Sequence, residues 1–313
     1  MHHYQAASYV GHDTIVKLLL EKGADVNTQG GFCGNAPQAA SYAGHEAIAK
    51  LLVEKGAEVN AQGGHYGNAL YAASYQGPET IAKLLIEKGL DINAQGGYYG
   101  NALQAASYEG HEAIANLLIQ NGAEVNAQGG HYGNALQVAS YEGHEAIAML
   151  LIEKKADVNA QGGNYGNALQ AASCRGYEAI AKLLIANKAD VNAKGGEFGN
   201  ALQAASYGGN EAITNLLIEK GAEVNAQAGK FGNALQAASC RGYEAIAKLL
   251  IKKGADVNAQ GGYYGNALQA ASYEGQKAIA KLLMQKGADG NAQGGQFGNT
   301  FQAALFQSCE VWY

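Results

Sequence analysis

The side chains best suited to chemistry in this chain, histidine and cysteine, recur at regular intervals and not in one cluster. Nucleophilic, acid–base and metal chemistry all need unlike groups within hydrogen-bonding reach of one another. Cys174 and Cys240 are separated by the same number of residues as His65 and His131. Equal separations indicate equivalent positions in a repeated structure, so the elements that position these side chains must be identified first.

A repeat of 33 residues runs through the chain. A Gly-Asn pair recurs at this interval, and its asparagines are Asn35, Asn68, Asn101, Asn134, Asn167, Asn200, Asn233, Asn266 and Asn299. A second asparagine series, from Asn27 to Asn291, keeps the same interval, and 42 of the 44 glycines fall in five columns of the repeat. The 313 residues therefore make about nine and a half units with no insertion or deletion between them.

Each unit predicts two short helices. In residues 60–92, Asn68 is a suitable N-cap for a first helix (helix A), Gly77 ends it, and a second helix (helix B) runs from Glu79 to the stop at Gly89. Helices of about eight to ten residues are marginal in isolation, so stability must come from stacking one pair on the next. The sequence predicts an all-α solenoid with β-turn fingers, such as the one at Gly63-Gly64, projecting between helix pairs.

Composition excludes several classes of protein. With 21 Lys and Arg against 27 Asp and Glu, the formal charge of −6 lacks the basic excess that coating a nucleic acid requires. A chain with 44 Gly, only 2 Pro and 48% apolar residues is neither disordered nor collagen-like. There is no apolar run of about 18 residues, and the start Met1-His2-His3-Tyr4 shows no basic segment followed by an apolar one, the pattern of a secretion signal. The chain has no Asn-x-Ser/Thr sequon, and its four cysteines are unevenly placed. We therefore expect an intracellular location, cytoplasmic or nuclear, and no membrane contact.

The chain resembles the ankyrin-repeat family over nearly its whole length. The family's Gly-Ala-Asp-Val-Asn-Ala segment is matched at Gly23 to Asn27 and Gly254 to Ala259, each after an Ile/Val-x-x-Leu-Leu helix. The start of helix A departs from the family's Thr-Pro-Leu-His and has Asn-Ala-Leu-Gln, as at residues 101–104, and Gly-Gly replaces the usual turn aspartate. In this form the chain looks like the long, uniform arrays of fungal ankyrin proteins. We expect a single array over residues 1–306 and a tail at 307–313.

Stacked repeats separate the reactive side chains. Equivalent positions lie about 10 Å apart per layer, so Cys174 and Cys240 would be roughly 20 Å apart, beyond the ~7 Å limit for a disulfide. The same separation argues against a zinc site built from His65 and His131. The glycine-rich string at residues 96–101 superficially suggests a phosphate loop, but its repetition favours a structural turn. We expect the family's structural role, capping or turn packing, for the histidines at the start of helix B: His12, His45, His111 and His144.

Two variable columns on the uniform scaffold are the candidates for recognition. One precedes the finger aromatic residue, from Phe32 to Gln296, and the other closes helix A, from Val10 to Glu274. The resemblance implies that finger tips and helix A line a concave groove used for partners. With the helix A tyrosines, the candidate partner-binding residues are His65, Tyr75, Tyr98, Tyr108, Glu109, His131, Tyr141, Glu142, Asn164, Arg175, Glu197, Tyr207, Lys230 and Arg241.

Two aromatic columns lie between these positions. The finger column includes Tyr66, Tyr99 and Phe198, and we favour a role for it in bracing the fingers. The helix A column is open between bracing and binding. Cys174 and Cys240 interrupt this column, and each is followed by arginine. The pattern predicts a surface patch near these repeats with more positive charge and less aromatic area, where an acidic segment of a partner could dock.

The function that agrees best with these features is non-catalytic binding of another protein. We expect no cofactor, no metal and no direct contact with nucleic acid. The resemblance implies a regulator, transcription co-regulators included. One alternative is a small-molecule binder or enzyme that uses the aromatic groove; another is a fragment detached from a longer protein. We expect a monomer unless exposed end units associate. At the C-terminal end, Phe301, Phe306 and Trp312 could fold back as a cap or leave the last unit open.

Overall fold

The computed structural model describes the backbone of residues 3–310 and the side chains of residues 4–305. The chain divides into two compact units, residues 1–157 and 158–313, which are described one at a time. All regular elements among the described residues are helices, as the repeat predicted.

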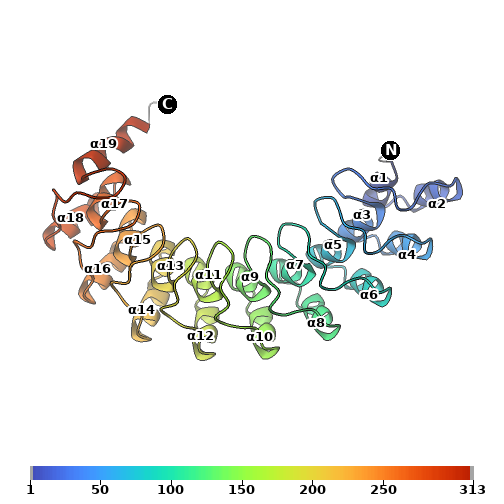
Figure 1. Cartoon of the computed structure of the whole chain (residues 1–313), viewed down its shortest axis with the longest axis horizontal. Coiled ribbons are helices and arrows are strands. Elements are labelled where there is room, and N and C mark those ends of the chain that lie inside the picture. Colours follow the sequence, from blue (N-terminus) through green and yellow to red (C-terminus); the bar gives the residue numbers. More distant parts are fainter. Residues whose placement is uncertain (1–2, 311–313) are drawn as a thin grey trace. The chain divides into compact units, whose positions relative to one another are not determined.

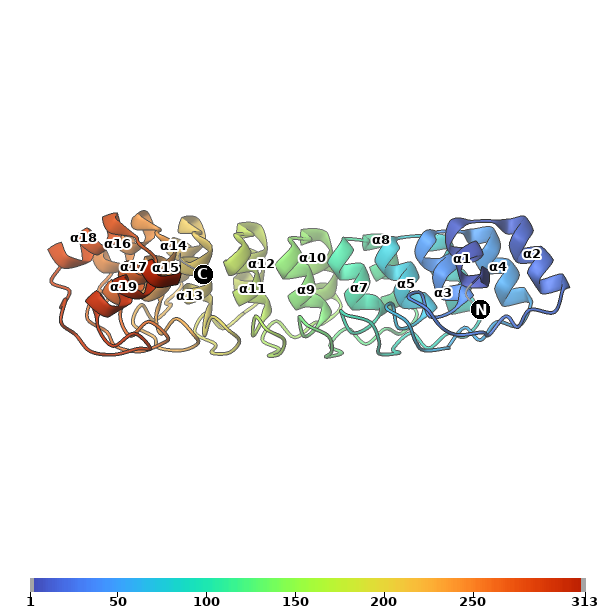
Figure 2. The same cartoon turned by 90° about the horizontal axis from the view of Figure 1, so that it is seen from above.

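The first unit (unit 1) contains five consecutive helix pairs, and in each pair an A helix is followed by a B helix. The A helices lie side by side in one row, the B helices form a second row, and the fingers project from the A row (Figures 1 and 2). The A helices are α1 (His3–Val10), α3 (Ala36–Ala43), α5 (Ala69–Gln76), α7 (Ala102–Glu109) and α9 (Ala135–Glu142). The B helices are α2 (Asp13–Glu21), α4 (Glu46–Glu54), α6 (Glu79–Glu87), α8 (Glu112–Gln120) and α10 (Glu145–Glu153).

The second unit (unit 2) repeats the same two rows. Its A helices are α11 (Ala168–Arg175), α13 (Ala201–Gly208), α15 (Ala234–Arg241), α17 (Ala267–Tyr273) and α19 (Thr300–Glu310). Its B helices are α12 (Glu178–Ala186), α14 (Glu211–Glu219), α16 (Glu244–Lys252) and α18 (Lys277–Gln285). Helix α19 extends through the first part of the expected tail, and the Phe301 side chain is 71% exposed. The Phe301 side chain is therefore mostly in solvent, and the Phe306 and Trp312 side chains lie outside the described residues.

The A helices begin at the asparagines that the sequence indicated. The Asn101 side chain accepts a hydrogen bond from the Gln104 N–H at 2.9 Å, and the same bond recurs at the other A helices that follow a finger. At α3, α9 and α15 the side chain of the third-position Gln also accepts a hydrogen bond from the backbone N–H of the cap residue, which completes a capping box.

The histidines at the start of the B helices do not cap them, which corrects one of the two roles we expected. No side-chain cap bond is present at His45, His111 or His144. Instead, Nε2 of His45 lies 2.9 Å from the carbonyl oxygen of Tyr9, near the end of α1, which is the A helix of the preceding repeat. The ring also lies against Gly11, where an added Cβ would fall 2.5 Å from it. These histidines therefore join successive repeats by packing on the turn.

Side-chain amides join successive repeats. Gln203 of helix A is fully buried, and its Nε2 donates to the carbonyls of Ala226, Ala228 and Gly232 in the following finger, at 2.7–3.3 Å. The second asparagine series makes an equivalent bridge after helix B. Asn93 donates to the Gly122 carbonyl at 3.2 Å and accepts from the Glu124 N–H at 2.8 Å. Each finger and each interhelical loop is thus held by the repeat before it.

The core between the rows consists of large aliphatic residues facing small ones. Ile81 and Leu85 of α6 are completely buried, as are the neighbouring Ala72 and Ala73 of α5. Alanine at these positions allows the helix backbones to approach closely, while the B helices supply the apolar area that stabilises the stack.

Helix B usually ends at a glycine with positive φ, but two repeats place lysine there. Lys155 and Lys188 adopt φ of 70° and 69°, the left-handed conformation that glycine adopts at Gly122 and Gly221. A side chain in this conformation costs about 1–2 kcal/mol. No neighbouring atom crowds the equivalent glycines, so the cost is confined to the backbone.

We expect Lys155→Gly to stabilise the protein by up to about 1 kcal/mol, because relief of backbone strain exceeds the entropy cost of glycine. The midpoint of urea unfolding should rise. Lys154→Gly is the matched control, since it removes the same charge at a residue with φ of −85°. That change should lower the midpoint, and an equal effect of the two substitutions would contradict the strain at Lys155.

Candidate functional site

The fingers and the exposed side of the A helices form one surface in each unit, here called the finger–helix A face. All fourteen residues that we expected on it are at least partly accessible. The exposed ones are His65, Tyr98, Glu109, Asn164, Arg175, Glu197, Lys230 and Arg241. The half-buried ones are Tyr75, Tyr108, His131, Tyr141, Glu142 and Tyr207. The first eight positions by number belong to unit 1 and the other six to unit 2.

Each finger is closed by its own backbone, and most fingers are also bonded to the one before them. In the finger of residues 95–100, the Gly96 N–H donates to the Gly100 carbonyl at 2.6 Å. Between fingers, the His65 N–H donates to the Phe32 carbonyl at 2.8 Å, and the Lys230 N–H donates to the Glu197 carbonyl at 3.0 Å. The tips are therefore positioned by backbone bonds and present their side chains from a fixed base.

Aromatic rings brace the base of the fingers. In unit 2 the rings of Phe198 and Phe231 are 5% and 4% exposed and stack with centroids 6.1 Å apart. In unit 1, Tyr99 stacks on Tyr132 at 6.0 Å. This is the bracing role that we favoured for the finger column.

The helix A tyrosines interlock with the same rings. Tyr42 stacks on Tyr66 of the next finger at 4.2 Å, and Tyr99 stacks on Tyr108 at 4.0 Å. The helix A column therefore braces the fingers and also presents half-buried ring edges to the surface. Substitutions at Tyr108 would disturb the scaffold together with any contact to a partner.

The two units carry opposite charge on this face. In unit 1 the fingers and A helices contain no Lys or Arg, and their charged residues are Glu109 and Glu142. Among the described side chains of unit 2, the same elements contain Arg175, Lys194, Glu197, Lys230 and Arg241, and Glu274 directly follows α17. The side chain of Glu310, at the end of α19, lies outside the described residues. One surface is acidic and tyrosine-rich and the other is predominantly basic, although the net charge of the chain is only −6.

Two of the basic residues of unit 2, Arg175 and Arg241, directly follow Cys174 and Cys240 in the sequence. The Arg241 guanidinium lies over the Tyr207 ring, 5.0 Å from its centroid. Cys240 is buried, and its thiol donates to the Tyr264 hydroxyl at 3.3 Å, which in turn donates to the Glu274 carboxylate at 2.8 Å. Burial, with the hydrogen bond to Cys240 as the second cause, raises the pKa of Tyr264 above its ordinary value. Cys240, Tyr264 and Glu274 thus form a chain of hydrogen bonds in which each donor has an acceptor.

Two residues of the face were left out of the set of fourteen candidates. Phe32 begins the variable finger column; it is 64% exposed and stacks on His65 at 4.8 Å. Tyr71 occupies the helix A column that elsewhere contains glutamine, and it is only 2% exposed. The available signal for Tyr71 was this single interruption of a uniform column.

A hollow of about 210 Å³ opens on the face beside Tyr71. It is lined by Tyr42, His65, Tyr66, Tyr71, Tyr75, Tyr98 and Tyr99. Small-molecule sites usually span about 300–1,000 Å³, so the hollow is better matched to a single side chain of a larger partner.

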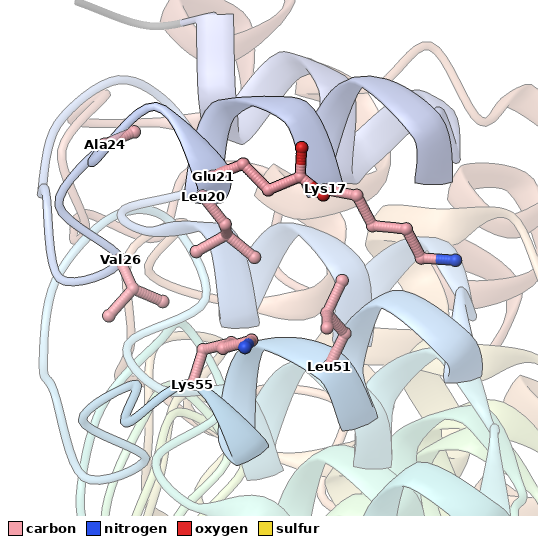
Figure 3. Close-up of a pocket in the computed structure, with 7 residues that line it drawn as sticks. All are labelled: Lys17, Leu20, Glu21, Ala24, Val26, Leu51 and Lys55. Atoms are coloured by element: carbon pink, nitrogen blue, oxygen red, sulfur yellow. The ribbon is translucent and has the colours of Figure 1, made fainter.

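Two further hollows belong to the packing of the B helices. A space of about 430 Å³ lies between α2 and α4, where Leu20 and Leu51 point into it and the Lys17 ammonium points away (Figure 3). A similar space of about 430 Å³ recurs between α4 and α6. Because the furrow repeats with the helices, it reflects helix spacing and does not indicate a specific site.

The described residues contain no group of three or more His, Cys, Asp or Glu arranged to hold a metal ion. Cys33, Cys174 and Cys240 are free thiols. None of the helices in the described part of the chain is long and apolar enough to span a membrane.

The tyrosine cluster predicts a loss of stability at high pH. Burial raises the pKa of both Tyr71 and Tyr75 to about 12, from an ordinary value near 10. The folded state holds these tyrosines in their neutral form, whereas the unfolded chain ionises them near pH 10. Their contribution to stability is therefore complete below pH ~10 and is lost as the pH rises toward 12. Urea unfolding midpoints should fall over that interval in parallel with tyrosinate absorbance. Tyr75→Phe should reduce the slope, and a midpoint unchanged up to pH 12 would contradict the argument.

Comparison with known proteins agrees with this geometry. A family model described as ankyrin repeats (3 copies) matches residues 4–96, 38–129, 102–195 and 201–294. No curated protein gives a significant match. Among solved structures, the human ASB11 ankyrin repeat domain is similar, with 22% identity, a TM-score of 0.62, and coverage of 71% of this chain and 98% of that one.

Ankyrin repeats generally serve as protein–protein interaction modules and are typically not enzymes. The 33-residue helix pairs, the projecting fingers and the family match together show that the chain belongs to the ankyrin-repeat family.

Proposed function

We propose that the protein is a non-catalytic scaffold whose finger–helix A face binds another protein. The observation that carries this proposal is the exposure of large rings at finger tips: Phe32 is 64%, Tyr98 53% and Tyr263 37% exposed. The fold does not require the Tyr98 and Tyr263 rings to be exposed, because the next residue of each finger, Tyr99 or Tyr264, already braces it by stacking. In the finger of Phe32 the next residue is Cys33, so that finger has no inner ring. Exposed aromatic residues on a braced base are suited to an interface, since little side-chain freedom is lost on binding.

The division of charge supports two contact areas of different preference. The acidic, tyrosine-rich face of unit 1 favours a basic segment, and the arginines beside Cys174 and Cys240 favour an acidic one. We propose that residues 1–306 act as a single monomeric array inside the cell, in a regulatory role that could include transcription co-regulation. The free thiols are consistent with a reducing compartment.

We expect alanine changes at finger tips to weaken partner binding without unfolding the scaffold. One variant carries Tyr98→Ala and His131→Ala in unit 1, and a second carries Lys230→Ala and Tyr263→Ala in unit 2. The half-buried Tyr108 and Tyr141 are left intact because they pack on finger rings. Loss of an interface anchor costs more than 1 kcal/mol, so capture of native partners should fall at least about fivefold for one variant or both.

The matched control changes the surface of helix B. Glu79→Ala with Lys83→Ala removes an exposed ion pair on α6, away from the fingers. Quantitative co-purification from cells that express the protein naturally should give the wild-type partners with this control. Equal melting temperatures must accompany the comparison. A partner set unchanged by both tip variants would refute the proposed binding face.

A further inference from the structure

The finger stack of unit 1 is interrupted at one position, where Tyr71 stands in the glutamine column. In the neighbouring repeat, Gln38 donates to the carbonyls of Ala61 and Gly67. Tyr71 cannot make these bonds, and its hydroxyl instead accepts the Tyr99 N–H at 3.1 Å. Its ring lies against Gly97, where an added Cβ would meet the ring at 2.5 Å.

This exchange coincides with a break between the tips of two successive fingers, although the finger bases stay in contact at Gly67 and Gly97. Backbone bonds join the Phe32 and His65 tips and the Tyr98 and His131 tips, at 2.8 and 3.3 Å. Their rings stack at 4.8 and 5.3 Å. Among the described residues of unit 1, the remaining pair of successive tips, His65 and Tyr98, shows neither the backbone bond nor a ring contact. The gap in the ladder coincides with the hollow of about 210 Å³, which both side chains line.

The walls of the hollow are aromatic and its electrostatic surroundings are negative. Tyr42, Tyr66, Tyr75 and Tyr99 contribute ring surface, and no Lys or Arg is present among the lining residues. Burial is the main cause of the raised pKa of Tyr75, and the next is its hydrogen bond with Glu109. The charge of Glu109 also acts on Tyr71. A cation entering the hollow would therefore meet aromatic faces and a nearby carboxylate.

We propose that this hollow receives the guanidinium group of an arginine on a basic segment of the partner, inserted between the rings of His65 and Tyr98. This inference rests on the partner-binding role proposed above and names the chemistry of the partner. A guanidinium is planar, stacks on aromatic faces and donates several hydrogen bonds, whereas a lysine ammonium is a hydrated point charge. A flat cation suits the interrupted stack because it takes the place of the missing ring contact.

The test uses short capped peptides as probes, with the sequence Gly-Gly-X-Gly-Gly and X as arginine, lysine or citrulline. Citrulline keeps the planar shape of arginine and lacks the charge. Binding is followed through the backbone amide NMR signals of His65, Tyr98 and Tyr99. The arginine peptide should bind at least about tenfold more tightly than the other two, with the largest shifts at these three residues.

Tyr71→Gln is the decisive variant, because it restores the residue found at this column in the other repeats and should fold at least as well. It should close the gap, and arginine binding should fall at least about tenfold while the melting temperature is unchanged or higher. Glu109→Gln leaves the walls in place and should weaken the arginine peptide several-fold with no effect on citrulline. Equal binding of arginine and citrulline, or full binding by Tyr71→Gln, would overturn the inference.

The same variant separates this inference from the broader one. Native partners that remain bound to Tyr71→Gln but are lost from the tip variants would overturn the arginine site and leave the binding face standing. Partners lost from Tyr71→Gln and from the unit 1 tip variant, together with arginine-selective peptide binding, would support both.

Discussion

The structure depends on amide side chains that form hydrogen bonds with the backbone of the next repeat. Gln203 of α13 is completely buried and donates to three carbonyls of the following finger. The half-buried Asn93 joins the loop after its own helix B to the corresponding loop of the next repeat. A buried carbonyl without a donor costs about 1–3 kcal/mol, so each finger conformation is stabilised only when its neighbour is in register. Helices of eight or nine residues acquire stability in this way, through a sum of neighbour contacts.

The same amide ladder determines where the surface can vary. Since the finger base is held by glutamine and braced by rings such as Phe198 and Phe231, the tip residue can change without cost to the fold. This separation of support and display explains how exposed rings, carboxylates and arginines occur at equivalent positions of nearly identical repeats. It also places the acidic face in one unit and the basic face in the other.

Tyr71 shows what happens when the ladder itself changes. A tyrosine fills more volume than a glutamine and accepts a bond where glutamine donates, and the tip of the following finger lacks the backbone bond to the preceding tip. A hollow lined by seven residues lies at this position. One substitution in a structural column thus creates a surface feature that no tip residue could create.

Periodicity alone determined the fold class, the repeat length, the asparagine caps and the separation of cysteines and histidines, because identical local signals must build identical helix pairs. The sequence also identified the variable columns, since positions free of packing are the ones that differ between repeats. The tertiary structure decided that His45 packs on the A helix of the preceding repeat and does not cap the B helix of its own repeat. The sequence could not decide this, because the contact joins residues 36 positions apart. Only the structure revealed the gap at Tyr71, because the gap arises from the size of one ring against the backbone of another finger.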